Sequence, residues 1–217
     1  MQNSIETGVF ELGAKLESLW GFVAFFGLKK AAKSIKRRMP YRFDVLISKA
    51  QIEKRVAELA AHIDADYAPL IGKGSLLVIG ILKGSFVFTA DLLRQLSLPA
   101  QVDFLEVASY QGTESTGYLR WLREPRIGIE GRHVLVVEDI VDTGVTMNAI
   151  LHKLKENRPA SLKLCSLLHK PSRQKVAVPI DYKGFTIEDY FVIGYGLDYE
   201  EKYRQISEIV LFSPERT

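Results

Sequence analysis

The chain has a single cysteine among its 217 residues, so no disulfide can form within it. That residue, Cys165, lies in the apolar run LKLCSLL, which favours a buried and inert thiol over a reactive one. The sequence also has no cluster of cysteines and histidines at the spacing of zinc ligands. We therefore expect neither a disulfide scaffold nor a zinc site.

Two common nucleotide-binding signatures and a membrane span are also missing. No G-x-G-x-x-G follows an expected strand, which disfavours a Rossmann site, and the absence of G-x-x-x-x-G-K-[ST] excludes a P-loop. The densest apolar stretch, LWGFVAFFGL, has ten residues, whereas a helix that crosses a bilayer needs about 20. A ligand site, if there is one, must therefore use other residues.

The positive charge is confined to one end of the chain. The net charge is +3, but residues 1–39 contain seven Lys/Arg and three Glu, whereas residues 40–217 contain 22 basic and 23 acidic residues. A main body without excess positive charge argues against a nucleic-acid-binding protein. With 47% hydrophobic and 25% charged residues, the composition is that of a globular protein with one ordinary domain and a small appendage.

Residues 1–39 differ from the rest and are expected to form an N-terminal extension. Apolar residues recur there at helical spacing, and the basic run KKAAKSIKRR follows, which predicts an extra amphipathic helix. Three interpretations remain open: a helix that docks on a membrane surface or a partner, a plain extra helix or tail, or residues upstream of a true start at Met39. The basic residues follow the apolar run, which is the wrong order for a secretory signal, and we expect a cytoplasmic protein.

From residue 40 onward, apolar runs typical of buried strands alternate with segments of helical periodicity. The expected helices cover residues 48–63, 86–96 and 145–157, and the expected strands cover 76–82, 101–110, 133–137, 162–168, 190–196 and 208–213. Such alternation predicts an α/β domain over residues 40–217 with a parallel sheet. The polar segment that follows residue 110 is expected to be a loop, either functional or a plain surface excursion.

The segment VLVVEDIVDTGVTM, residues 134–147, joins an expected strand to an expected helix and carries an unusual density of polar groups. Ligands of open α/β sheets bind at the carboxyl ends of the strands, which is where this segment lies. Four of its residues fall at the helix N-terminus, where free N–H groups and the helix dipole favour a phosphate: Thr143, Gly144, Val145 and Thr146.

Acidic residues occupy the first half of the same segment. Glu138 and Asp139 would repel a phosphate, and they suit the hydroxyl groups of a sugar or a Mg²⁺ ion. A phosphate at one end and a diol with a metal at the other describe a phosphorylated ribose. Asp142 lies between the two halves, near the expected reacting carbon, unless it serves only as the N-cap of the helix.

The stretch VVEDIVDTGVTM resembles the phosphoribosyl-pyrophosphate-binding motif of type I phosphoribosyltransferases. Other segments resemble the hypoxanthine-guanine branch of that family, in its order and spacing: ILKGSFVFTADLLRQL (81–96), SYQGTESTG (109–117), SLLHKPSR (166–173) and FVIGYGLDYEEKYR (191–204). The resemblance covers about residues 43–213. It implies a parallel sheet with helices on both faces, a small hood subdomain, and a homodimer or homotetramer.

The family's reaction is Mg²⁺-dependent transfer of the 5-phosphoribosyl group from phosphoribosyl pyrophosphate to N9 of hypoxanthine or guanine, a purine-salvage step that gives IMP or GMP and pyrophosphate. The resemblance implies that Asp142 is the general base and that Glu138 and Asp139 hold the ribose hydroxyls. It assigns the 5′-phosphate to Thr143, Gly144 and Thr146, with Val145 where the family often has lysine. Two alternatives stay open: a regulator that binds phosphoribosyl pyrophosphate without catalysis, and a sister enzyme that prefers xanthine or a pyrimidine.

The resemblance also assigns the residues around the pyrophosphate. Lys83 and Gly84 would bind it after a cis peptide bond between Leu82 and Lys83, although Lys83 could instead be a strand-end lysine in solvent. Arg204 would be a second pyrophosphate contact, and the metal would be held by Glu138, Asp139 and Asp198. Ser109 and Tyr110 belong to a loop that would close over the site and exclude water.

The purine would be bound from the later part of the chain. Lys170 can only donate hydrogen bonds, so it suits an oxygen on C6 of the purine and leaves an amino group there unpaired. Phe191 would stack on the base and the backbone of Val192 would pair with its edge, whereas a purely core role is the alternative for Phe191.

Overall fold

The structure is a computed structural model that describes residues 41–72, 74–109 and 119–214. The expected N-terminal helix and Tyr110 lie outside these residues. Contacts divide the chain into two units, one formed by residues 43–212 and the other by residues 1–42 with 213–217. Every expected site residue belongs to the first unit.

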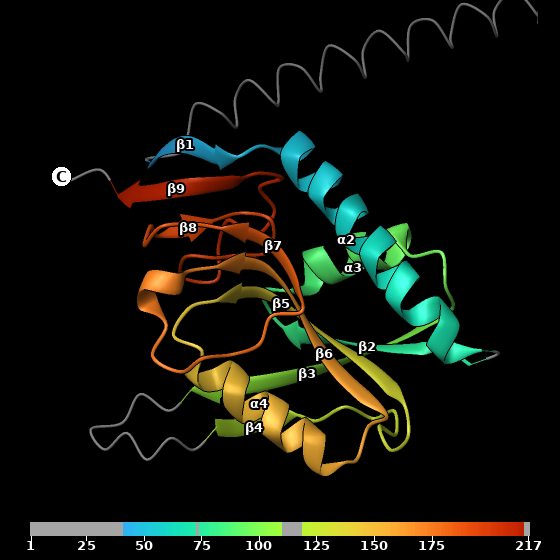
Figure 1. The fold of residues 1–217 in the computed structure, drawn as a ribbon. Helices are drawn as coiled ribbons and strands as arrows, with labels where there is room; N and C mark the ends of the chain where they lie inside the picture. The colour runs from blue at the N-terminus through green and yellow to red at the C-terminus, as the bar shows by residue number, and fades with distance from the viewer. Residues whose placement is uncertain (1–40, 73, 110–118, 215–217) are drawn as a thin grey trace, which may run out of the picture. The chain divides into compact units, whose positions relative to one another are not determined.

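A six-stranded sheet, in the order β4-β3-β2-β5-β6-β7, forms the framework of that unit (Figure 1). Its strands are β2 (Leu76–Leu82), β3 (Ala100–Ser109), β4 (Leu119–Arg123), β5 (His133–Val141), β6 (Ser161–His169) and β7 (Tyr182–Thr186). All neighbouring strands pair in parallel except β4, which runs antiparallel to β3. The carboxyl ends of the parallel strands therefore meet along one edge, as the α/β prediction requires.

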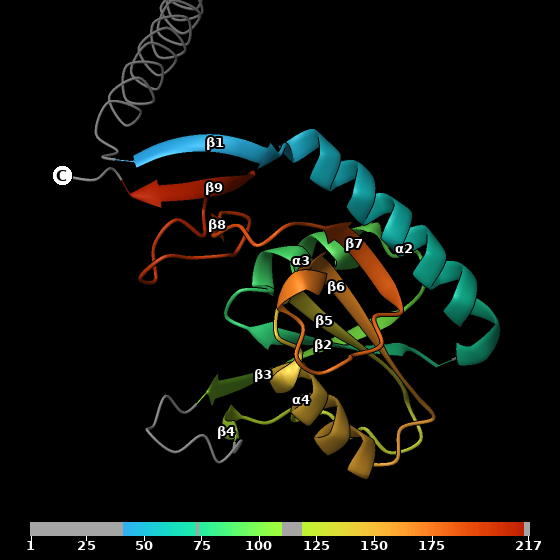
Figure 2. The same cartoon turned by 60° about the vertical axis from the view of Figure 1, so that its left-hand side comes forward.

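Helices cover both faces of this sheet, which confirms the predicted layering (Figure 2). On one face, Val78 and Val137 pack with residues of α2 (Lys49–Ile71) and α3 (Phe86–Gln95). On the other face, Leu77 and Val136 pack with residues of α4 (Val145–Glu156). Because successive side chains of a strand point to opposite faces, a strand covered on both sides must be apolar throughout, and the run LLVIGIL of β2 has this pattern.

A second sheet has three strands in the order β1-β9-β8 and corresponds to the expected hood. They are β1 (Tyr41–Ile47), β9 (Ile209–Pro214) and β8 (Val192–Ile193), of which β8 and β9 pair antiparallel. The prediction of a strand over residues 190–196 was too long. Gly194 and Gly196 have φ angles of 94° and 100°, so the chain turns directly after Ile193.

Other elements differ from the prediction as well. Strands β1, β4 and β7 were not predicted, and β4 follows the small, polar residues that were expected to be a loop. Helix α2 begins with the expected capping box, in which Ser48 and Gln51 bond each other's backbone N–H groups. It continues eight residues beyond the predicted end at Ile63, to Ile71, because its buried stripe continues through Tyr67.

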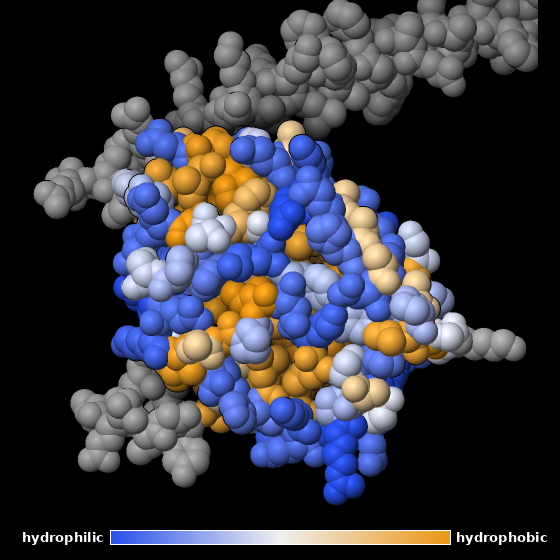
Figure 3. Space-filling view, in the orientation of Figure 1, coloured by the Kyte–Doolittle hydropathy of each residue, from blue (hydrophilic) through white to orange (hydrophobic). Residues whose placement is uncertain are grey.

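The face seen in Figure 3 carries apolar area over α4 and the neighbouring strands. A groove of about 440 Å³ lies there, lined by Leu151 of α4, Leu162 and Leu164 of β6, and Pro179 among others.

None of the helices in the described part of the chain is both long enough and apolar enough to span a bilayer. The thiol of Cys165 is buried in the core and its pKa is raised by that burial, as expected for an inert cysteine.

Candidate functional site

The expected site residues gather where the parallel strands end. Lys83 follows β2, Asp142 follows β5, and Lys170 follows β6. Strands β2, β5 and β6 are adjacent in the sheet, so the three side chains start from neighbouring positions along one edge. This is the edge at which open α/β sheets bind their ligands.

The turn between β5 and α4 has the geometry of an anion site. Helix α4 begins at Val145 with Gly144 as its N-cap, at a φ angle of 78°. Because glycine has no side chain, the cap leaves the N–H groups of the first helical turn to a ligand. Asp142 does not cap the helix, since its carboxylate bonds Arg173 instead. The capping interpretation of Asp142 is therefore wrong.

The two acidic residues of the motif lie inside β5, which extends to Val141 rather than ending at Val137. Burial raises the pKa of Glu138 well above its usual value, and the neighbouring Asp139 raises it further. Burial likewise raises the pKa of Asp139 to about 6, against the lowering effect of backbone hydrogen bonds and of Arg204. One carboxylate oxygen of Glu138 is buried without a hydrogen-bond partner among the described residues.

These two carboxylates have the chemistry of a site that is completed by a cation. A buried acceptor without a partner, beside a second carboxylate, is stabilised by a hydroxyl donor or by Mg²⁺. Among residues 41–72, 74–109 and 119–214, no three acidic, histidine or cysteine side chains cluster as a metal shell. Mg²⁺ commonly binds through one or two carboxylates, with water and substrate phosphates as its other ligands, so the residues present fit that mode.

The loop after β2 lies against the acidic pair. The peptide bond between Leu82 and Lys83 is cis, as the resemblance implied. A methyl group added at Gly84 would overlap the carboxylate of Asp139, and one added at Gly196 would overlap the carbonyl oxygen of Gly84. Only glycine allows these three segments to approach so closely.

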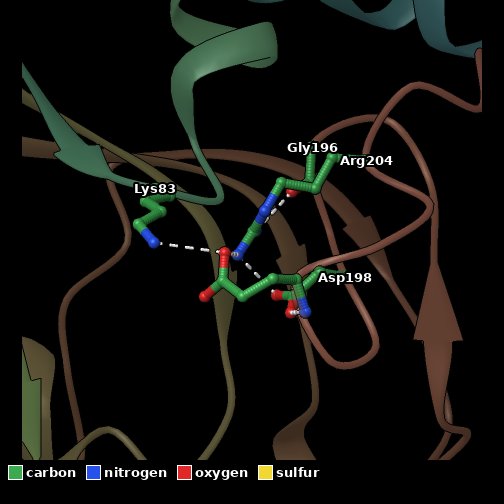
Figure 4. Close-up of polar contacts among 5 residues, drawn as sticks. Lys83, Gly196, Asp198 and Arg204 are labelled. Carbon is green, nitrogen blue, oxygen red and sulfur yellow. Dashed lines mark hydrogen bonds and ion pairs between the residues drawn. The ribbon is translucent and has the colours of Figure 1, made fainter.

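A charge network joins this loop to the segment that follows β8 (Figure 4). The Nζ atom of Lys83 lies 3.2 Å from the Oε2 atom of Glu201. The Nη2 atom of Arg204 lies 3.2 Å from the same Glu201 oxygen and 2.9 Å from the Oδ1 atom of Asp198. Arg204 also donates to the carbonyl oxygen of Gly196. Lys83, Asp198 and Arg204 are thus brought together, and the partly solvent-exposed Lys83 is paired with Glu201.

The expected purine contacts lie at the end of β6 and at the start of β8. Lys170 is 8% exposed, and its Nζ atom lies 3.7 Å from the Oδ1 atom of Asp189. Phe191 is 55% exposed, and its ring contacts Tyr199 and Phe212 at ring-centre distances of 5.9 and 5.7 Å. An exposed ring that other rings hold in place suits a stacking platform better than a core position.

The remaining expected residues are placed only in part. Val192 belongs to β8 and its side chain is buried, so its backbone is the part available to a ligand. Ser109 is the last residue of β3, and the loop that follows lies outside the described residues. Thr143, Val145 and Thr146 lie at the start of α4, with Val145 exposed.

Three charged residues at this edge were missed by the sequence analysis: Arg173, Asp189 and Glu201. Arg173 and Glu201 lie within the segments that carry the resemblance, but Asp142, which Arg173 contacts, and Lys83, which contacts Glu201, are far along the chain. A basic residue soon after Lys170 was the available signal for Arg173.

Comparison with known proteins places this arrangement in a family. A family model described as "Phosphoribosyl transferase domain" matches residues 45–200. The hypoxanthine phosphoribosyltransferase of Haemophilus influenzae is 42% identical over 170 residues, which cover 78% of this chain and 94% of that protein. The hypoxanthine-guanine phosphoribosyltransferase of Mycobacterium avium is 43% identical over 173 residues, covering 78% and 85%.

Solved structures give the same result. The hypoxanthine phosphoribosyltransferase of Trypanosoma cruzi in complex with the product IMP superposes with a TM-score of 0.74 at 43% identity, covering 81% of this chain and 96% of that chain. A hypoxanthine-guanine phosphoribosyltransferase of Bacillus anthracis with a HEPES molecule in its active site superposes with a TM-score of 0.72 at 41% identity, covering 77% and 97%.

Proposed function

Because the chain belongs to the hypoxanthine-guanine phosphoribosyltransferases of the phosphoribosyl transferase family, we propose that it makes purine nucleotides by salvage. The proposed reaction transfers the 5-phosphoribosyl group of phosphoribosyl pyrophosphate to N9 of hypoxanthine or guanine. Its products are IMP or GMP and pyrophosphate. The chain is accordingly a pentosyltransferase, and its substrates are proposed from its relatives and its site.

One observation carries the proposal: a single strand-turn-helix unit offers two opposite kinds of binding group. The glycine-capped N-terminus of α4 suits the 5′-phosphate, with Thr143 and Thr146 adding hydroxyl donors. The partly buried carboxylates of Glu138 and Asp139 suit the two ribose hydroxyls. A phosphorylated ribose is the ligand that needs both within one turn.

The pyrophosphate end of the substrate would lie against the charge network of Figure 4. Lys83 and Arg204 supply positive charge, and Gly84, which has no side chain, lets a ligand approach the backbone closely. As the leaving group departs, the anomeric carbon becomes cation-like, so these cations stabilise charge that accumulates on the pyrophosphate oxygens. Mg²⁺, held by one or two of the carboxylates of Glu138, Asp139 and Asp198, would supply further charge neutralisation for the leaving pyrophosphate.

Asp142 is proposed as the general base that takes a proton from the purine ring while N9 attacks. It follows β5 directly and lies between the diol and phosphate halves of the turn. Lys170 would donate to the oxygen on C6, Phe191 would stack on the ring, and the Val192 backbone would pair with its edge. Adenine, which carries an amino group at C6, would leave Lys170 without an acceptor.

Three further assignments belong to the proposal. Residues 1–39 form an extension outside a transferase domain of residues 40–217. The active form is a homodimer or homotetramer located in the cytoplasm. The loop that begins at Ser109 and Tyr110 closes over the substrates and keeps water away from the activated carbon.

The decisive experiment is an assay of hypoxanthine, guanine, xanthine and adenine side by side with phosphoribosyl pyrophosphate, with Mg²⁺ and with excess chelator. We expect turnover of hypoxanthine and guanine, little of adenine, and loss of all activity with chelator. Dominant turnover of xanthine would replace the proposed substrates with those of the sister enzyme. Binding of phosphoribosyl pyrophosphate without turnover of any base would indicate a regulator instead.

A further inference from the structure

The segment that follows β6, residues 170–176, wraps around the turn that carries Asp142. The backbone N–H of Lys170 donates to the carbonyl oxygen of Val141 at 3.0 Å, just before Asp142. The N–H groups of Lys175 and Val176 donate to the carbonyl oxygen of Thr143 at 2.9 and 3.1 Å, just after it. The turn is therefore clamped on both sides of Asp142.

Arg173 lies in the middle of that segment, in the short 3₁₀ helix η1 (Pro171–Arg173), and its side chain faces the clamped turn. Its Nε atom donates to the Oδ1 atom of Asp142 at 3.0 Å. Its Nη1 atom lies 3.5 Å from the Oδ2 atom of Asp189, whose other oxygen lies 3.7 Å from Nζ of Lys170. Charged groups thus run without a break from Lys170 through Asp189 and Arg173 to Asp142.

We propose that Arg173 is a positioning residue for the transfer reaction, which holds the Asp142 carboxylate through one oxygen and leaves the other to accept the purine proton. Through Asp189, the same guanidinium links the position of Asp142 to that of Lys170. The proton acceptor and the residue that contacts the oxygen on C6 are thereby held at a fixed distance from each other. This inference rests on the proposed function, because it takes Asp142 as the base and Lys170 as the purine contact.

The energetics separate this role from a structural one. The side chains of Arg173 and Asp142 are 47% and 38% exposed, and ion pairs at such exposure add little to stability. The clamp itself consists of backbone hydrogen bonds, which a side-chain substitution leaves in place. A misplaced catalytic group, in contrast, can cost about a hundredfold in rate for a shift near 1 Å. Loss of Arg173 should therefore be seen in turnover and not in folding.

The test compares kcat, KM and thermal unfolding for the parent chain, Arg173→Ala and Arg173→Lys. We expect Arg173→Ala to lower kcat about tenfold to a hundredfold, with KM for phosphoribosyl pyrophosphate and the melting temperature nearly unchanged. Arg173→Lys should restore only part of the loss, because one ammonium cannot reproduce the two-sided contact to Asp142 and Asp189. Lys175→Ala is the matched control, since it removes one exposed positive charge from the same segment and should leave kcat unchanged.

A double-mutant cycle gives the sharpest readout. In an Asp142→Asn chain, which has already lost the carboxylate, Arg173→Ala should cause little further loss of kcat. Equal losses in both backgrounds would overturn the inference, as would a parent-like kcat in Arg173→Ala. A parent chain inactive with every base would overturn the proposed function as well, whereas an active parent with an unaffected Arg173→Ala would overturn this inference alone.

Discussion

The carboxylate of Glu201 lies between the two cations that a pyrophosphate group would also need. Hydrogen bonds from Lys83 and Arg204 lower the pKa of Glu201, so it is ionised at neutral pH. An exposed side chain that occupies both cations must release them before a ligand can bind there. We therefore expect Glu201 to compete with the pyrophosphate group of the proposed substrate for Lys83 and Arg204.

This competition predicts that Glu201→Gln binds Mg²⁺-pyrophosphate about twofold to fivefold more tightly than the parent chain, because an exposed ion pair contributes modestly. Isothermal titration calorimetry measures the change directly. Glu200→Gln is the control, since it removes the same charge from the adjacent position, where the contact is to Lys202. Weaker binding by Glu201→Gln would mean that Glu201 instead holds Lys83 and Arg204 in their productive places.

Removal of the proposed base gives a second prediction for a single side chain. Asp142→Asn keeps the shape of the residue but loses the proton acceptor, so kcat should fall by about a hundredfold. Binding of phosphoribosyl pyrophosphate should persist, because the substitution leaves unchanged the residues of the turn that would bind the ribose diol and the phosphate. Steady-state kinetics and a binding titration would measure the two effects, and unchanged turnover would remove the assigned role.

Residues were predictable from the sequence where the chemistry is local. Between Glu138 and Thr146, carboxylates are followed directly by a helix N-terminus, and this local pattern is enough to predict a site for a phosphorylated sugar. Arg173 as the partner of Asp142, and Glu201 as the partner of Lys83, could not be found this way, because these contacts join positions 31 and 118 residues apart. Only the fold brings those pairs together.

Strands β3 and β4 and the chain after them are joined by one buried carboxylate. Asp103 of β3 accepts hydrogen bonds from the N–H groups of Arg126 and Ile127 and from the guanidinium of Arg123. Burial alone would raise the pKa of Asp103, but backbone hydrogen bonds from Ile127, Phe104 and Arg126, together with Arg123, outweigh it and the pKa is lowered. The ionised form is therefore the one that the fold stabilises.

Asp103→Asn should lower the free energy of unfolding by about 1.5–3 kcal/mol at neutral pH, the usual contribution of a hydrogen bond to a charged group. A lowered pKa stabilises the fold above the unfolded-state value of about 3.9, and that contribution is lost as pH falls through the folded-state pKa. Urea unfolding of both chains between pH 7 and pH 3 measures this. The difference between them should shrink toward the acid end, and a constant difference would contradict the assignment.

Elements were predicted well where a long apolar pattern decides them and poorly where it does not. β2, β5 and α4 have such patterns. β4 is LRWLR, in which half-buried Leu119, Trp121 and Arg123 alternate with exposed Arg120 and Leu122. With an arginine on the half-buried side and a leucine on the exposed side, its apolar pattern did not indicate a strand. Around β8 the apolar run does not alternate, and such a run does not distinguish a strand from a buried turn.

At the scale of the molecule, every described site residue belongs to residues 43–212, and the family match covers residues 45–200. A chain that begins at Met39 should therefore keep kcat and both KM values within about twofold, since the removed residues include none of the expected site residues and none of the family match. Gel filtration and the four-base assay would test this together. Loss of folding or of assembly in the shortened chain would show that residues 1–38 are integral.

The class of fold followed from the sequence, but its connectivity did not. Continuous apolar runs separated by helical patterns are enough to predict a parallel sheet with helices on both faces. The strand order β4-β3-β2-β5-β6-β7 depends on crossovers that no local pattern encodes. The pairing of β1 with β9 joins the two ends of the domain, which is also beyond local reasoning.

Gly144 has a consequence that reaches past its own turn. A Cβ atom there would meet the carbonyl oxygen of Val176. Any larger residue must therefore separate the N-terminus of α4, which would bind the phosphate, from the segment of residues 170–176, which begins with Lys170. Gly144→Ala should thus raise KM for both phosphoribosyl pyrophosphate and the base, although the substitution only replaces one hydrogen atom by a methyl group. The close contact at Gly144 therefore controls the binding of both substrates.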